Sequence, residues 1–368
     1  MLTPSPHHAQ QEHPGHRNNP KNYKNKRIKM GKIQSQIIII TAALLAVSCS
    51  RQTMSVEELR VEHMENPAVV DATHPRLSWI NIPKSQKARG IKQTAYRIVV
   101  ASSKENLKQG IYDLWDSGKQ LSEESDLIPY QGKTLPSAQD CYWKVQTWDQ
   151  DGKPTAWSKP SYWGMGLMNE DEWQAQWIAP LLGGPGAPLL RKHFDSEGQI
   201  KQAKVFVCGL GYFELYVNGE RIGDDYLVPN MTDYTKRFDL EKGPIAISGN
   251  MSRHRVMYLA YDITKQIQEG RNALGVILGN GFYDAVNLNI PCSKFGDECL
   301  RLQLQLTYAD GTTQTVISDN TWETKPSAIT LNGVHAGEIY NANLETPLWA
   351  TTEDNSQGWQ RVKCIEGP

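Results

Sequence analysis

Two short polar stretches carry the residues that could bind a ligand. Pro229–Asp233 reads PNMTD and Asn280–Asn289 reads NGFYDAVNLN, so both concentrate carboxylate and amide oxygens. Calcium prefers such oxygens, and a bound calcium can also accept sugar hydroxyls. A simpler interpretation is that these Asn and Asp residues only form turns. The candidate calcium ligands are Asn230, Asp233, Asn280 and Asp284, and the rings that could support a sugar are Tyr234 and Tyr283.

Paired carboxylates would point instead to hydrolysis of a glycosidic bond, which needs two acids facing each other at a set separation. Each acid in the second half of the chain also fits a turn, a cap or a solvated face, and sequence alone cannot pair them. No nucleophile elbow, HExxH motif or phosphate-binding loop occurs in a convincing context. The sequence therefore assigns no catalytic residue among Asp224, Asp225, Asp233, Asp262, Asp284, Glu338 and Glu345.

Composition limits the classes of partner and the architecture. The 368 residues contain 39 Lys and Arg against 40 Asp and Glu, a net charge of -1, which does not favour a nucleic-acid partner. A chain of this length is expected to form two or more domains. The 11 Trp and 15 Tyr against 6 Phe suit sugar binding and the cores of β-sandwiches alike.

The first fifty residues predict export and not a fold. Residues 1–29 are polar and indicate a disordered extension before a second possible start at Met30. Residues 30–49 read MGKIQSQIIIITAALLAVSC, a lipoprotein signal peptide whose apolar run is too short to span a bilayer. Cys49 would then be lipidated, which places the protein in a Gram-negative cell envelope, in the outer membrane or the periplasm. The alternative is an ordinary signal peptide that contains a cysteine.

Alternating apolar and polar residues predict an all-β protein of two sandwiches. Residues 55–168 contain about seven short strands, typical of a fibronectin-III-like or immunoglobulin-like sandwich. Residues 169–188 form a linker that ends in a Gly-Gly-Pro-Gly breaker. Residues 189–345 predict a larger sandwich of jelly-roll type, with a hairpin turn at Asn218-Gly219 and a short helix from about Thr264. Residues 346–368 would begin a further domain.

Several motifs resemble the N-terminal part of bacterial α-L-rhamnosidases of glycoside hydrolase family 78. ENPAVVDATHPRLSW, QTAYRIVVASS and YWKVQTWDQDG resemble the first module of that family, and GLGYFELYVNGERIGDDYLVPNMTDYTKR and NALGVILGNGFYD resemble the sandwich that follows. The resemblance implies release of terminal α-L-rhamnose with inversion by two glutamates in an (α/α)6 barrel. It also implies that, in some members, this sandwich binds rhamnose through calcium.

The chain departs from the family pattern in two places. Residues 238–255 are inserted after TDYTKR, and GEIYNANLE carries Asn341 and Asn343 where the family usually has Asp and Arg. No (α/α)6 barrel is expected in this chain. Three hypotheses follow: the accessory part of an α-L-rhamnosidase, a stand-alone carbohydrate-binding lipoprotein, or a structural spacer. The expected partners are rhamnose-containing glycans and, through the lipid anchor, a membrane.

Overall fold

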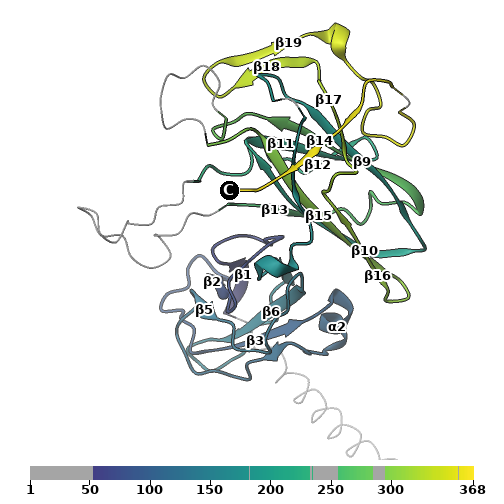
Figure 1. Ribbon diagram of the computed structural model, residues 1–368. Helices are drawn as coiled ribbons and strands as arrows, with labels where there is room; N and C mark the ends of the chain where they lie inside the picture. Colours follow the sequence, from purple (N-terminus) through teal and green to yellow (C-terminus); the bar gives the residue numbers. More distant parts are fainter. Residues whose placement is uncertain (1–52, 182, 233, 235–255, 285–294, 355) are drawn as a thin grey trace, which may run out of the picture. The chain divides into compact units, whose positions relative to one another are not determined.

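The computed structural model describes residues 53–368, except 182, 233, 235–255, 285–294 and 355 (Figure 1). The predicted signal segment with Cys49, the insertion at 238–255 and the candidate ligand Asp233 therefore lie outside the described residues. Residues 54–368 form a single unit. Within the described part, none of the helices combines the length and apolar character that crossing a membrane requires.

The first module is a sandwich of two antiparallel sheets. One sheet has the order β1-β2-β5 and the other β4-β3-β6-β7. Along β6 every second side chain is buried, as its sequence pattern predicts, so that Trp143 and Val145 face the core beside Trp163 of β7. The strands are β1 (Met54–Val61), β2 (Arg76–Pro83), β3 (Ala95–Ala101), β4 (Trp115–Asp116), β5 (Ile128–Pro129), β6 (Asp140–Trp148) and β7 (Ser161–Gly164).

A short helix, α2 (Lys104–Gln109), follows β3 and packs beside this second sheet. The Ser103 hydroxyl accepts a hydrogen bond from the Asn106 N–H, and Gly110 ends the helix with a φ of 78°. Both are common helix-end signals. Six residues carry too little periodicity to be recognised, so the sequence did not predict this helix.

The second module is a larger sandwich of two six-stranded antiparallel sheets (Figure 1). One sheet follows the path β13-β10-β15-β8-β21, with β16 on β15, and the other has the order β12-β11-β14-β9-β17-β20. The core between them is mainly aliphatic, with Trp322 fully buried in it. The expectation of an all-β chain with a second, larger sandwich is confirmed.

The strands of the second module alternate between its two sheets along much of the chain. They are β8 (Trp177–Ala179), β9 (Leu189–Ser196), β10 (Ile200–Leu210), β11 (Tyr212–Val217), β12 (Glu220–Ile222), β13 (Leu259–Asp262), β14 (Gly270–Gly279), β15 (Cys299–Tyr308), β16 (Thr313–Ile317), β17 (Glu323–Lys325), β20 (Gln360–Arg361) and β21 (Lys363–Ile365). A separate hairpin pairs β18 (Ile329–Gly333) with β19 (Gly337–Tyr340). The 3-10 turns η1 and η4 cover Glu170–Glu172 and Ala342–Leu344.

Of two local features predicted in the second module, the hairpin turn at Asn218-Gly219 is present and the helix from Thr264 is not. Asn218 and Gly219 have φ values of 49° and 87° and join β11 to β12, which confirms the predicted hairpin. The helix expected from Thr264 is only a turn, in which the Gln266 and Ile267 N–H groups donate to the carbonyl of Ile263. Gly270, with a φ of 85°, follows this turn and begins β14.

Both ends of the second module extend beyond the expected boundaries. The strand β8 falls inside the predicted linker 169–188 and pairs with β15 and β21. Within 346–368, β20 pairs with β17 and β21 pairs with β8, so that this segment adds a strand to each sheet. Strands of two or three residues are too short to show an alternation of apolar and polar residues. The sequence therefore predicted a linker and the start of a further domain in these places.

Candidate carbohydrate-binding site

The two tyrosines proposed to support a sugar ring face each other in the protein interior. Tyr234 and Tyr283 are 7% and 6% exposed, and their rings meet edge to face with centroids 5.1 Å apart. Phe295 stacks on Tyr283 at 6.2 Å. Burial raises the pKa of the Tyr283 hydroxyl far above its usual range. The rings are thus core residues, and the expectation that Tyr234 and Tyr283 form a sugar-binding surface is wrong.

The candidate Asn280 is fully buried, and its amide is engaged by the protein. Its Oδ1 accepts a hydrogen bond from Asn332 Nδ2 at 2.7 Å, and its backbone N–H donates to Asn332 Oδ1 at 2.8 Å. Its Nδ2 lies 3.4 Å from the carbonyl of Gly184 and 3.4 Å from a carboxylate oxygen of Asp284. The sequence missed Asn332, because only the fold brings β18 to the end of β14.

Among the described members of the proposed calcium set, the contact that the structure shows is that between Asn280 and Asp284. Asn280 and Asp284 lie together, whereas Asn230 is exposed and Asp233 lies outside the described residues. Within the part of the chain that the structure describes, no group of three acidic, His or Cys side chains could hold a metal ion. The described residues therefore do not fit calcium by themselves, and calcium binding stays a prediction that depends on Asp233.

Close backbone packing explains a glycine beside these loops. A Cβ at Gly211 would lie 1.9 Å from the backbone oxygen of Asn280, a distance that no real side chain allows. Gly211 sits between β10 and β11, directly against the start of the polar loop that follows β14. Glycine is required here because backbone approaches backbone.

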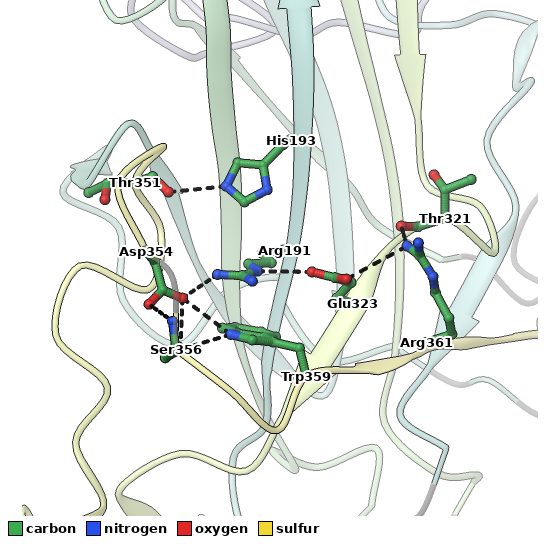
Figure 2. Close-up of polar contacts among 9 residues, drawn as sticks. All are labelled: Arg191, His193, Thr321, Glu323, Thr351, Asp354, Ser356, Trp359 and Arg361. Atoms are coloured by element: carbon green, nitrogen blue, oxygen red, sulfur yellow. Dashed lines mark hydrogen bonds and ion pairs between the residues drawn. The ribbon is translucent and has the colours of Figure 1, made fainter.

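A buried polar cluster, centred on Arg191 of β9, holds the C-terminal segment against the sandwich (Figure 2). Arg191 Nε donates to Glu323 at 3.2 Å, and Arg191 Nη1 donates to Asp354. The guanidinium carbon lies 3.7 Å from the centroid of the Trp359 ring, a cation–π contact. The cluster thus ties β9 to β17 and to the segment that leads into β20.

The carboxylate of Asp354 is the most heavily bonded member of this cluster. It accepts hydrogen bonds from the backbone N–H and the hydroxyl of Ser356, both at 2.9 Å, and from the Trp359 indole at 3.2 Å. Burial alone would raise the pKa of Asp354, but the Ser356 hydrogen bonds and the Arg191 charge outweigh it, so that the pKa is lowered. Because the charged side chains of Arg191 and Asp354 are hydrogen-bonded within the cluster, we interpret the cluster as structural, with no reactive group presented.

Two family descriptions match successive parts of the chain. Residues 56–169 match the Rha78A-like, N-terminal immunoglobulin domain, and residues 198–245 and 250–368 match the α-L-rhamnosidase N-terminal domain. The chain therefore belongs to the α-L-rhamnosidase family, because it contains two of the N-terminal domains of that family.

Individual proteins that are similar to this chain are also α-L-rhamnosidases. An α-L-rhamnosidase of Formosa agariphila is 31% identical over an alignment of 374 positions, which covers 91% of this chain and 37% of the relative. One from Alteromonas sp. is 29% identical, over 88% of this chain and 35% of the relative. The solved α-L-rhamnosidase from Dictyoglumus thermophilum is 34% identical with a TM-score of 0.72, over 85% of this chain and 34% of the solved one. The chain thus spans about a third of the length of these relatives.

Proposed function

We propose that this chain is the N-terminal accessory part of an α-L-rhamnosidase, which releases terminal, non-reducing α-L-rhamnose from glycosides or polysaccharides with inversion. The observation that carries the proposal is the succession of the two domain families along one chain. The described residues form strands and short turns around two aliphatic and aromatic cores, which is an architecture for binding or support.

The alternatives differ in whether the second sandwich binds the sugar. In the binding hypothesis, the exposed Asn230 and the neighbouring Asp233 contact calcium and rhamnose. In the spacer hypothesis, both sandwiches only hold a catalytic domain away from the membrane. Asn280 does not discriminate between them, because replacing a buried, hydrogen-bonded amide costs stability in either case.

Titration calorimetry with L-rhamnose separates these two hypotheses. For the binding hypothesis we expect heat of binding in calcium, its loss in excess chelator, and at least about a tenfold weaker affinity for Asp233→Ala. Asn343→Ala, at an exposed position of the turn η4, is the matched control and should bind like the parent chain. Absence of heat with and without calcium would leave only the spacer role.

We further propose that Cys49 anchors the protein to a membrane through lipid. A run of small residues directly before this cysteine supports the proposal. Expressed in a Gram-negative host with labelled palmitate, the parent chain should carry label and sediment with membranes, and Cys49→Ala should do neither. Cys364→Ala, which removes an exposed cysteine, should behave like the parent. Label retained by Cys49→Ala would refute the anchor.

A further inference from the structure

A cavity of about 630 Å³ opens beside α2 and the outer face of β6. The first module supplies most of its lining, and Lys204 of β10 and Asp262 of β13 complete it. The volume lies within the range of ordinary small-ligand sites. Of the residues considered so far for a site, Asp262 is the one that lines it.

The charge of this cavity is predominantly positive. Lys104, Lys108 and Lys144 line it, and in the described part of the chain none of the three makes an ion pair. Lys204 is neutralised by Asp140, to which it donates. The Lys144 ammonium lies 5.0 Å from the centroid of the Trp157 ring and 5.5 Å from that of Tyr112, cation–π contacts that leave its charge uncompensated by a carboxylate. The one carboxylate in the lining of this cavity is that of Asp262, which already accepts a hydrogen bond from the Thr264 N–H at 3.0 Å.

Aromatic rings lie next to these cations. Tyr142 and Tyr162 line the cavity with ring centroids 5.2 Å apart, and the Lys104 ammonium lies 5.6 Å from the Tyr142 centroid. The Tyr162 hydroxyl donates to Asp140 at 2.8 Å, which fixes its ring. Burial raises the pKa of Tyr142 to about 12, so its hydroxyl stays protonated and can donate. A ring with a polar edge beside ammonium groups suits a sugar that carries a negative group.

A second hollow, of about 1240 Å³, lengthens the site. It shares Lys104, Tyr142 and Asp262 with the first cavity, so the two are neighbours. Its lining adds the charged residues Glu105, Asp140, Lys201 and Lys265, of which Asp140 is paired with Lys204. It also adds side-chain hydroxyls and amides, from Ser102, Ser103, Asn106, Ser137, Gln139 and Gln202. Such groups can hydrogen-bond the neutral hydroxyls of a sugar. The two hollows together are large enough to accommodate more than one sugar residue.

We propose that this groove, defined by Lys104, Lys108, Lys144 and Tyr142, binds an anionic saccharide, a glycan segment bearing carboxylate or sulfate groups. The inference rests on the proposed function in one respect, because it names acidic, rhamnose-containing polysaccharides as the substrate class of the parent enzyme. The hydroxyl- and amide-rich lining favours a glycan over a lipid surface, and the net charge of -1 disfavours nucleic acid.

Calorimetric titration of the whole chain with defined saccharides tests the groove. The probes are oligogalacturonate for carboxylate, dextran sulfate oligomers for sulfate, and neutral dextran oligomers as a control. We expect binding of at least one anionic probe at low salt, weakening as salt rises, and none of the neutral one. For Lys104→Gln/Lys108→Gln/Lys144→Gln we expect a loss of affinity of at least about tenfold.

A second triple variant controls for net charge. Lys87→Gln/Lys119→Gln/Lys133→Gln removes the same charge from exposed positions of the same module that do not line the groove, and it should retain the parent's affinity. The melting temperatures of both variants should match that of the parent, which shows that the fold is intact. A loss confined to the groove variant supports the site.

Three outcomes would overturn the proposal. They are absence of binding to both anionic probes, equal loss in both triple variants, and groove-dependent binding to phosphatidylglycerol vesicles in place of saccharides. Oligogalacturonate contains no rhamnose, and the titration needs no hydrolysis. Failure of the rhamnosidase proposal would therefore leave this result unaffected, and failure here would leave rhamnose binding and hydrolysis to be judged separately.

Discussion

Replacing Arg191 by alanine is expected to lower the free energy of unfolding of the second module by about 3–5 kcal/mol. The side chain of Arg191 is 8% exposed and that of Asp354 4%, so the substitution leaves a buried carboxylate without its cation. It also removes the cation–π contact with Trp359. Urea unfolding at pH 7, followed by circular dichroism, measures the change.

Arg361→Ala is the matched control for this prediction. Arg361 lies 3.9 Å from the carboxylate of Glu323, which also accepts a hydrogen bond from Arg191. Its side chain, however, is 65% exposed. Exposed ion pairs contribute little, so its loss should cost at most about 1 kcal/mol. Equal effects of the two substitutions would show that the Arg191 cluster does not hold the C-terminal segment in place.

The pH dependence of the difference in unfolding free energy between the parent chain and Arg191→Ala provides a second test. The pKa of Asp354 is lowered in the folded protein, so its contribution is present above the unfolded pKa, near 3.9, and is lost as pH falls through the folded pKa. The gap between the parent chain and Arg191→Ala should therefore narrow below about pH 4. A gap that stayed constant into acid would point to packing rather than charge.

Sequence patterns predicted the strands that alternate over many residues. β6 and β15 run for 9 and 10 residues, long enough for the period of two to stand out, and the Asn218-Gly219 turn requires positive φ at both positions. By contrast, β20 and β21 contain 2 and 3 residues. Their pairing is decided by strands far away in the chain, which a local pattern cannot reveal.

The candidate site was less predictable because the same residue types serve a ligand and a core equally well. Tyr234 and Tyr283 looked like a sugar platform, but their rings pack on each other. The groove lysines were missed for the opposite reason. Lys104 and Lys108 lie on α2 and Lys144 on β6, and only the packing of the helix against the strand places their charges around one cavity.

The chain by itself is expected not to hydrolyse rhamnosides. An inverting glycosidase needs an acid and a base that face each other across the sugar, and the sequence and the described fold assign no such pair. Enzymes accelerate their reactions at least about a millionfold, so presence and absence of activity are easily distinguished.

Release of nitrophenol from p-nitrophenyl α-L-rhamnopyranoside by the purified chain tests the accessory role most directly. A relative of full length, such as the α-L-rhamnosidase from Dictyoglumus thermophilum, serves as the positive control for the assay. The accessory role predicts a rate equal to that of the buffer blank, while the same sample is folded by circular dichroism. Turnover that co-elutes with the chain on gel filtration in independent preparations would contradict it.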